Sequence, residues 1–566
     1  MKRTPALGFL TAQKRIGLVI SLLLVLAMLA ACAPQGTTAV PGQTNEPGKT
    51  AYNNLDLTVP ATYSPAISMK SVISVDATVK FHEGEDIYNN VWTRAYADLL
   101  GINLTYQWVV DASQYAQKLN ATIMSGEVPD VFHVDAQMLK LLYDSDLIAD
   151  MGQAYDVEAS DNTKDILAQD PIALKAASIE GKLMGIPITD ASIASAPLLW
   201  IRQDWMDKLG IPPPTGMDDV LRISERFVKE DPDGNGVDDT IGLAVTKNLW
   251  GAIAGLQGFF NGHHAYPGIW FEKDGQLQYG SVQPEMRQGL LTLQKMYQDG
   301  QIDREFGVKD INKINETIAN SKCGMEFGVW WNPYQPLQLS QQNDPDAFWT
   351  AYPIPSVDDR PAKSQYYTAV GSFLVVSKTY AHPEALVRMV NFWTDNIVRS
   401  ESQGIRDVFL GTLDAPDIIY YKYIMTQIWE PNAMLRGGKV LRQALAKRDP
   451  GLLNLDEQWR YQIILAYFDQ GIKEAWVEVA TNGEGGAVSI LETIAAGGGI
   501  MNQFYGAPTP VMGDKMATLR TMEDEVVTKI IMGDPIERFD QFVADWQRLG
   551  GDAITAEVNQ WKKQNP

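Results

Sequence analysis

Hydrophobic and polar positions alternate with two periods, that of a strand and that of a helix, along the first part of the chain. Val75, Ala77, Val79 and Phe81 alternate with polar residues, as the residues of a half-buried strand do. The segments that follow switch between the period of a helix and that of a strand. The expected elements are a strand over 75–81, a helix over 87–99, a strand over 102–108, a helix over 115–124 and a strand over 131–134. Strands that alternate with helices in this way indicate a mainly parallel α/β sheet.

The same two periods continue to about residue 400, after which the helical period dominates. Further elements are expected as short strands over 183–188, 198–202 and 371–377, and as helices over 217–229, 284–299 and 383–393. Glycine-rich breaks at 483–486 and 497–499 interrupt the later part. The pattern therefore predicts an α/β fold with a helical C-terminal portion.

The N-terminus carries an export signal. An apolar run over 16–31 follows Lys2, Arg3, Lys14 and Arg15, and it is shorter than the roughly 20 residues that a spanning helix needs. The run closes on Leu-Ala-Ala-Cys and resembles a bacterial lipobox, which implies lipidation of the Cys32 thiol and removal of residues 1–31. The alternative is an ordinary secretory signal with a chance cysteine. Residues 32–68 are rich in Pro, Gly, Thr and Asn and are expected to form a flexible tether.

Length and charge limit the function further. The chain of 566 residues is too long for one hydrophobic core and predicts two or three domains. Residues 1–31 hold four basic and no acidic side chains, so the net charge of −22 becomes −26 once they are removed. A surface this acidic argues against nucleic acid and anionic lipid as partners. Cys323, the other cysteine, has no histidine beside it to activate the thiol and is expected to be a small buried hydrophobe.

An acidic loop that begins at Asp231 resembles the first nine positions of a calcium loop of the EF-hand type. Oxygen-bearing side chains stand at positions 1, 3, 5 and 9, and Gly236 stands at position 6, where the turn is sharp. The expected Ca²⁺ ligands are Asp231, Asp233, Asn235, the carbonyl of Val237, Asp239 and Thr240. Position 12 is Gly242 rather than glutamate, so Thr240 or a water would have to complete the shell. The alternative is a solvated acidic turn between a helix and a strand.

Aromatic residues supply a second candidate site. Trp330 and Trp331 are followed by Asn332, and aromatic faces beside amide or carboxylate groups suit sugars, whose C–H faces stack while their hydroxyls form hydrogen bonds. Adjacent side chains on a strand point to opposite faces, so at most one tryptophan is expected to face a ligand. The alternative places both in the core.

Signals for catalysis are missing from the sequence. The five histidines show no metal-ligand spacing, and the chain has no GxSxG, no P-loop and no GxGxxG after a strand. No pair of carboxylates stands out as a glycosidase pair.

Taken together, the motifs resemble a known family, the extracellular solute-binding lipoproteins of ABC importers, of the large sugar-binding family 1 type. The resemblance runs from about residue 72 to 561. It rests on YAQKLN at 115–120, SGEVPD at 125–130, LMGIP at 183–187, WIRQDWMDKLG at 200–210, the acidic loop at 231–239, QPEM at 283–286, YQDGQID at 297–303, HPEA at 382–385, GAPTP at 506–510, FDQFVADW at 539–546 and EVN at 557–559. The acidic loop is similar to that of the alginate-binding members, where position 10 is acidic, whereas this chain has Thr240.

The resemblance implies a two-lobed clamp of the type II periplasmic-binding-protein kind. Lobe I is expected over 69–195 plus about 366–430, and lobe II over 196–365 plus about 431–566. Ligand contacts are expected from the ends of strands, although the two aspartates among them also fit solvated loops. The expected contacts are Asp135, Asp190, Trp330, Trp331, Asn332 and Tyr505.

The function that the resemblance implies is non-enzymatic capture of a carbohydrate, expected to be an oligosaccharide, and its delivery to an ABC permease. We expect a monomer held by lipid alone on the outer face of the cell membrane. Two alternatives remain: a surface polysaccharide-degrading enzyme, and a ligand-binding accessory of a membrane sensor kinase.

Overall fold

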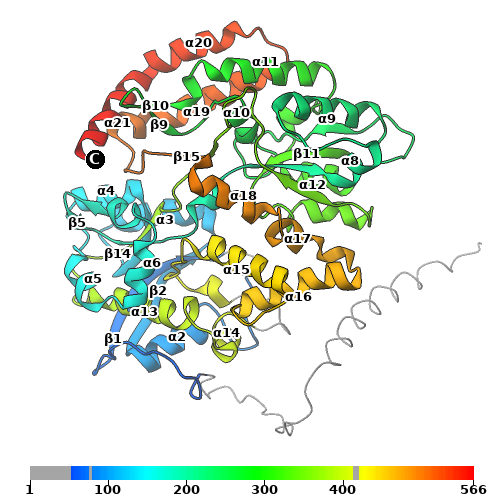
Figure 1. The fold of residues 1–566 in the computed structure, drawn as a ribbon. Helices are drawn as coiled ribbons and strands as arrows, with labels where there is room; N and C mark the ends of the chain where they lie inside the picture. The colour runs from blue at the N-terminus through cyan, green and yellow to red at the C-terminus, as the bar shows by residue number, and fades with distance from the viewer. Residues whose placement is uncertain (1–51, 76–78, 412–419, 566) are drawn as a thin grey trace, which may run out of the picture. The chain divides into compact units, whose positions relative to one another are not determined.

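Two β-sheets organise residues 52–75, 79–411 and 420–565, which are the residues that the computed structural model describes (Figure 1). The predicted signal, the Cys32 thiol and the first part of the predicted tether lie outside these ranges. Each sheet is packed within a hydrophobic core of its own. No helix in the described ranges has the length and apolar character needed to cross a membrane.

The first sheet has five strands in the order β2-β1-β3-β14-β6. They are β1 (Ile67–Ser74), β2 (Ile102–Val110), β3 (Val131–Asp135), β6 (Ile186–Pro187) and β14 (Ser372–Val376). Strand β1 is parallel to β2 and β3, whereas β14 arrives from a distant part of the chain and pairs antiparallel with β3 and β6. Strands β3 and β6 therefore run in the same direction and end at the same edge of the sheet, where β14 begins.

Helices from both ends of this region surround the first sheet. They are α2 (Val91–Ala95), η1 (Tyr96–Leu100), α3 (Ala112–Met124), α4 (Ala136–Asp144), α5 (Gly152–Glu158), α6 (Asp161–Ala168), α7 (Ala173–Ala176), α13 (Glu384–Trp393), η6 (Thr394–Val398), α14 (Gln403–Phe409) and η7 (Tyr420–Tyr423), with the short hairpin β4 (Ser178–Ile179) and β5 (Lys182–Leu183). Trp92 and Trp393 pack at 5.7 Å between ring centroids and join the early helices to the late ones.

The second sheet has four strands in the order β12-β7-β11-β8. They are β7 (Leu198–Arg202), β8 (Ile241–Leu243), β11 (Cys323–Gly328) and β12 (Trp349–Tyr352). Strand β7 is antiparallel to β11 and β12, and β11 is parallel to β8. Every residue of β7 and β11 is buried, because the sheet is covered on both faces.

The remaining elements complete the second region and the helical C-terminal portion. Around the second sheet lie η2 (Ser192–Ser195), α8 (Gln203–Leu209), α9 (Met217–Lys229), α10 (Gln257–Gly262), β9 (Trp270–Lys273), β10 (Gln276–Tyr279), η3 (Gly280–Val282), α11 (Glu285–Gln298), η4 (Phe306–Val308), α12 (Ile311–Ala319), η5 (Leu337–Gln342) and β13 (Ser364–Tyr366). The later elements are α15 (Ala433–Lys447), α16 (Leu455–Gln470), η8 (Lys473–Ala475), α17 (Trp476–Asn482), α18 (Ala487–Thr493), η9 (Ile494–Gly498), β15 (Gly499–Met501), α19 (Pro510–Ile531), α20 (Glu537–Trp546), η10 (Gln547–Gly551) and α21 (Asp552–Gln564).

The predicted α/β fold with a helical C-terminal portion is confirmed, and most predicted elements have their counterparts. The helix expected over 217–229 is α9, and the strand expected over 198–202 is β7. Cys323 is free and fully buried, as expected, and burial raises the pKa of its thiol to about 12.

Two predictions near the N-terminus are wrong. Of the strand expected over 75–81, residues 76–78 lie outside the described residues, and 75 and 79–81 are not in a strand. The strand of this region lies earlier, as β1, whose central residues are buried on both faces, so that its sequence does not alternate cleanly. The tether expected to reach residue 68 ends sooner: Tyr52 is buried and donates a hydrogen bond to Asp98 at 2.7 Å, and the amide of Thr58 donates to Asn396 at 2.8 Å. These contacts with distant residues are invisible in the local composition.

Candidate functional site

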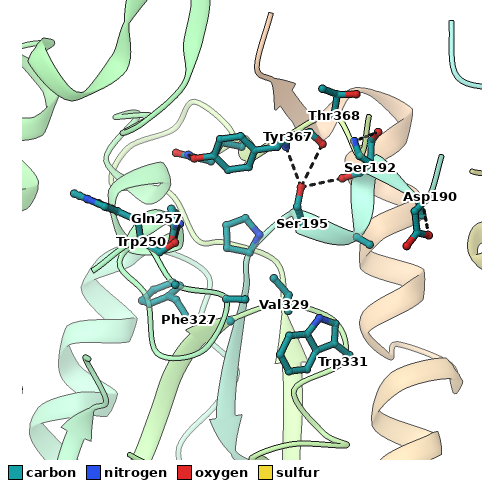
Figure 2. Close-up of a pocket in the computed structure, with 18 residues that line it drawn as sticks. Asp190, Ser192, Ser195, Trp250, Gln257, Phe327, Val329, Trp331, Tyr367 and Thr368 are labelled. Atoms are coloured by element: carbon teal, nitrogen blue, oxygen red, sulfur yellow. Dashed lines mark hydrogen bonds between the residues drawn. The ribbon is translucent and has the colours of Figure 1, made fainter. Parts of the chain in front are cut away.

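A cavity of about 390 Å³ lies where the chain passes from one sheet to the other. Residues 190–197 lead from β6 of the first sheet to β7 of the second, and residues 365–369 lead back from β13 toward β14. The segments 250–257 and 327–331 of the second region supply the rest of the lining. Segments from four separate places in the sequence therefore meet at one site (Figure 2).

Four aromatic rings, those of Trp250, Phe327, Trp331 and Tyr367, and several polar groups line this cavity. In Figure 2, Trp250 and Trp331 come from opposite sides of the lining, and the ring of Tyr367 lies above them. The polar lining residues are Asp190, Ser192, Ser195, Gln257, Gln365 and Thr368. Flat apolar faces beside hydroxyl, amide and carboxylate groups can stack on the C–H face of a sugar ring and bond its hydroxyls.

Hydrogen bonds tie the two crossing segments together. The Ser195 hydroxyl accepts from the amide of Tyr367 at 2.9 Å, and the Ser192 hydroxyl accepts from the amide of Ala369 at 2.8 Å. The short 3-10 helix η2 presents both serines to the opposite segment. The ring of Tyr367 is thus placed by residues that lie about 170 positions earlier.

A helix near the C-terminus fixes the tryptophan on one side of the cavity. The Trp250 indole nitrogen donates to the Asp524 carboxylate of α19 at 2.7 Å, and its ring lies 5.8 Å from that of Phe260. Burial raises the pKa of Asp524. Sequence reasoning missed both Trp250 as a lining residue and Asp524 as its partner, because no local pattern connects positions 274 residues apart.

A buried polar pair lies beneath the lining. Asn332 and Glu326 are both fully buried, and the Asn332 side-chain nitrogen donates to the Glu326 carboxyl at 2.7 Å and to the carbonyl of Ala252 at 3.3 Å. Burial raises the pKa of Glu326 to about 7. Asn332 was expected to touch the ligand. It instead supports the lining from below, because its side chain is enclosed between β11 and the Ala252 loop.

The adjacent tryptophans are separated. Trp331 lines the cavity, whereas Trp330 packs edge-on against Tyr334 within a hydrophobic core. Of the other expected contact residues, Asp190 lines this cavity and Tyr505 does not. The Tyr505 ring packs edge-on against Trp561, with 4.8 Å between centroids.

Asp135 lies at a second cavity, of about 370 Å³, at the edge of the first sheet. Its carboxylate caps α4 by accepting from the amide of Met138 at 2.7 Å. Tyr115 of α3 also lines this cavity, and its hydroxyl donates to the carbonyl of His133 at 3.1 Å. Asp135 and Asp190 thus follow the parallel strands β3 and β6 at one edge of the sheet, but each lines a different cavity.

The acidic loop places only part of its expected ligand set around a common point. Asp231 accepts from the amide of Gly236 at 3.0 Å through one carboxylate oxygen, while its other oxygen is buried without a partner. Asn235 donates from its amide nitrogen to Asp233 at 2.6 Å and accepts from the amide of Val237 at 2.6 Å. The unpartnered buried oxygen of Asp231 fits a cation. The next two expected ligands, Asp233 and Asn235, follow it at alternate positions of the loop.

The remaining expected ligands of the loop are engaged elsewhere. Asp239 pairs with Lys322 at 2.6 Å. Thr240 is buried and its hydroxyl donates to the carbonyl of Phe227 at 2.6 Å, near the end of α9. In the described part of the chain, no three acidic, histidine or cysteine side chains gather as a metal site.

Comparison with known proteins places these features in a family. The model of the bacterial extracellular solute-binding proteins matches residues 87–398, more than half of the chain. The polygalacturonan/rhamnogalacturonan-binding protein YtcQ of Bacillus subtilis is 23% identical over 476 residues, which are 82% of this chain and 86% of that protein. Lipoprotein LipO of the same organism is 30% identical over 241 residues, covering 41% of this chain and 45% of LipO.

A solved structure shares the fold over nearly its whole length. It is the EF-hand mutant of the substrate-binding protein FusA of Streptococcus pneumoniae in complex with fructo-nystose, with a TM-score of 0.59 and 16% identity, over 88% of this chain and 99% of that one. From the family match and this shared fold it follows that the chain belongs to the bacterial extracellular solute-binding proteins.

Proposed function

We propose that this protein binds a carbohydrate, expected to be an oligosaccharide, at the cavity lined by Trp250, Trp331 and Tyr367, and delivers it to the permease of an ABC importer. The observation that carries the proposal is the lining itself, in which four aromatic rings stand among hydroxyl and amide groups. The relatives support it: YtcQ is named for binding polygalacturonan and rhamnogalacturonan, and FusA was solved in complex with fructo-nystose.

The placement of the cavity suits a clamp. Its lining combines residues that follow β6 of the first sheet with residues that follow β11 of the second. A ligand that contacts both groups binds best when they are close together, so it favours the closed arrangement by its difference in affinity for the two forms. The two moving parts would be the predicted lobes. Lobe I covers 69–195 plus about 366–430, and lobe II covers 196–365 plus about 431–566.

Binding without chemistry is the function that the carboxylates favour. Among the described residues that line this cavity, Asp190 is the single carboxylate, whereas the usual hydrolysis of a glycosidic bond uses two. We assign Asp190 the role of accepting hydrogen bonds from sugar hydroxyls, and Trp331 the role of a stacking platform.

The N-terminal sequence and the acidic loop complete the proposal. We propose that the Cys32 thiol carries the lipid that holds the protein on the outer face of the membrane, a reading supported by the lipobox and by the name of LipO. We also propose that Asp231, Asp233, Asn235 and the carbonyl of Val237 hold a structural Ca²⁺, and that Asp239 joins them on leaving Lys322. The unpartnered oxygen of Asp231 and the EF-hand named for FusA support this.

A glycan screen tests the main proposal. The full chain in detergent is screened by thermal shift against mono- and oligosaccharides, and the hits are measured by isothermal titration calorimetry. A ligand at 100 times its Kd adds about 2.7 kcal/mol to the free energy of unfolding. The glycan must be recovered intact, because a cleaved glycan would support an enzyme and contradict the proposal.

Substitution of one aromatic ring provides the matched test of the site. Trp331→Ala removes the proposed stacking surface and is expected to weaken binding by roughly tenfold or more. Trp459→Ala is the control, since Trp459 is half exposed on α16 and lies outside the lining. Equal affinity of both variants and the parent would refute the assignment of this cavity.

Calcium needs its own measurement. Calcium is expected to raise the melting midpoint of the full chain relative to chelator, and Asp231→Asn is expected to abolish that rise. Glu484→Gln, an exposed acidic residue outside the loop, is the control. An identical calcium response in Asp231→Asn would remove the loop as the binding site.

A further inference from the structure

Both cavities belong to one edge of the first sheet. Ser372, the first residue of β14, pairs with Asp135 at the end of β3, and its carbonyl accepts from the amide of Ile188, just after β6. Ser372 lines the second cavity, and Ala369, three residues earlier, lines the first. The start of β14 therefore lies beside both cavities.

The second cavity has the same kind of lining as the first. Tyr115 contributes an aromatic ring, and Asn120 and Gln137 contribute amides. Two side chains of this lining, Asp135 and His133, can carry a charge near neutral pH. Burial lowers the pKa of His133, so its ring is uncharged at neutral pH.

Neither cavity has a lysine or arginine in its lining, among the residues that the structure describes. Carboxylates do stand at the walls. Asp190 and Asp135 belong to the linings, Asp524 holds the Trp250 indole, and the Ser192 hydroxyl lies 3.5 Å from Asp170. Recognition of a carboxylate on a sugar ordinarily uses arginine, lysine or amide donors, of which the charged ones are missing here.

Two cations near the linings, Arg520 and Lys118, are directed elsewhere. Arg520 of α19 is exposed, lines neither cavity and interacts electrostatically with Tyr367. It also interacts electrostatically with the carboxyl groups of Glu523 and Asp524 on the same helix. Near the second cavity, the Lys118 ammonium lies over the ring of Trp108, 5.4 Å from its centroid. Among the described lining residues, Asp190 and Asp135 are therefore the acidic groups of the two cavities, and no lysine or arginine stands beside them in the linings.

We infer that the ligand is an uncharged oligosaccharide, and that chains of uronic acid units are excluded by Asp190 and Asp135 at the two linings. The inference rests on the proposed function and narrows its substrate class. It separates this protein from YtcQ, which is named for binding polygalacturonan. A uronate would place a second negative charge beside an Asp carboxylate with no cation to offset it, and like charges at such distances repel.

The test compares ligands that differ in charge alone. Calorimetry with the full chain in detergent uses neutral tetrasaccharides of several linkages, tetragalacturonate, and the same tetragalacturonate with every carboxyl methyl-esterified. We expect a neutral tetrasaccharide to bind, tetragalacturonate to bind at least tenfold more weakly than any neutral hit, and neutral affinity to change less than twofold between low and high salt. Tetragalacturonate that binds as tightly as the best neutral ligand would overturn the inference and leave the proposed function standing. If no carbohydrate binds, the proposed function fails and this inference fails with it.

Variants identify the groups responsible. Asp190→Asn is expected to narrow the difference between tetragalacturonate and its methyl ester, because it removes the repelling charge while keeping a hydrogen-bond acceptor. Arg520→Gln is expected to leave the affinities for both ligands unchanged. Loss of tetragalacturonate binding in Arg520→Gln would show that this arginine recognises the carboxylate and would contradict the inference.

Discussion

The buried carboxyl of Glu326 gives the protein a stability that depends on pH. Glu326 lies on β11 under the lining of the first cavity, is fully buried, and accepts one hydrogen bond, from Asn332 at 2.7 Å, while its second oxygen has no partner. Burial, which disfavours the charged form, raises its pKa from 4.5 to about 7.

The sign and size of the effect follow from the two pKa values. Between 4.5 and about 7 the folded protein holds a proton that the unfolded chain has lost, so stability falls as pH rises through this window. The whole shift corresponds to about 3 kcal/mol, of which about 2 kcal/mol falls between pH 5.5 and pH 8.5. Glu326→Gln removes this titration and keeps the acceptor for Asn332.

The assay is urea unfolding of the parent and of Glu326→Gln at several pH values between 5.5 and 8.5. Tryptophan fluorescence and far-ultraviolet circular dichroism are followed together, because coincident transitions justify a two-state analysis. The free energy of unfolding of the variant, minus that of the parent, is expected to rise by about 2 kcal/mol across this range. Other titrating groups, such as Glu523, are present in both proteins and cancel in the difference. A difference that stays constant with pH, or that falls, would refute the reasoning.

Three further predictions concern stability. Burial and the neighbouring His264 lower the pKa of His263 to about 4, so stability is expected to fall by about 3 kcal/mol as pH drops from 6.5 to 4, and His263→Phe should flatten this dependence in urea titrations. Arg202 is fully buried, and its guanidinium donates two hydrogen bonds to the Asp204 carboxylate, at 2.8 and 2.6 Å. Arg202→Lys loses this paired geometry and is expected to lower the free energy of unfolding by about 2 kcal/mol. An unchanged midpoint in chemical denaturation would contradict this. Gly324→Ala would place a Cβ 2.1 Å from the Phe227 ring and is expected to lower the free energy of unfolding by about 1–3 kcal/mol, whereas Gly513→Ala, at an open position, should not.

Local patterns in the sequence were sufficient for the regular elements. The helix α9 was predicted at its observed bounds, because its buried positions recur at the helical period and need no distant partner to be recognised. The α/β order and the helical C-terminal portion were predicted for the same reason. The strand β1 was misplaced, because a strand buried on both faces loses the alternation that reveals a half-buried one.

The candidate site was predictable only where a residue ends a strand. Asp190 and Trp331, which were predicted as ligand contacts because they follow short apolar runs, both line the first cavity, and their contact with a ligand stays a prediction. Asn332 was misjudged, because the sequence shows an amide beside two tryptophans but does not show that this amide donates a hydrogen bond to the buried Glu326. The sequence likewise did not reveal that the Thr240 hydroxyl donates to the carbonyl of Phe227 near the end of α9.

The sequence by itself therefore determined the elements, the acidic character and the motifs that mark the family. Only the tertiary structure decided which side chains share a cavity, because that depends on pairings such as Trp250 with Asp524 and Ser195 with Tyr367, which join residues more than 170 positions apart. It also decided that, among the described residues, Asp190 and Asp135 line the two cavities without a lysine or arginine in either lining. The composition of the whole chain does not determine whether a carboxylate lies beside a cation, because that depends on the positions of the side chains in space.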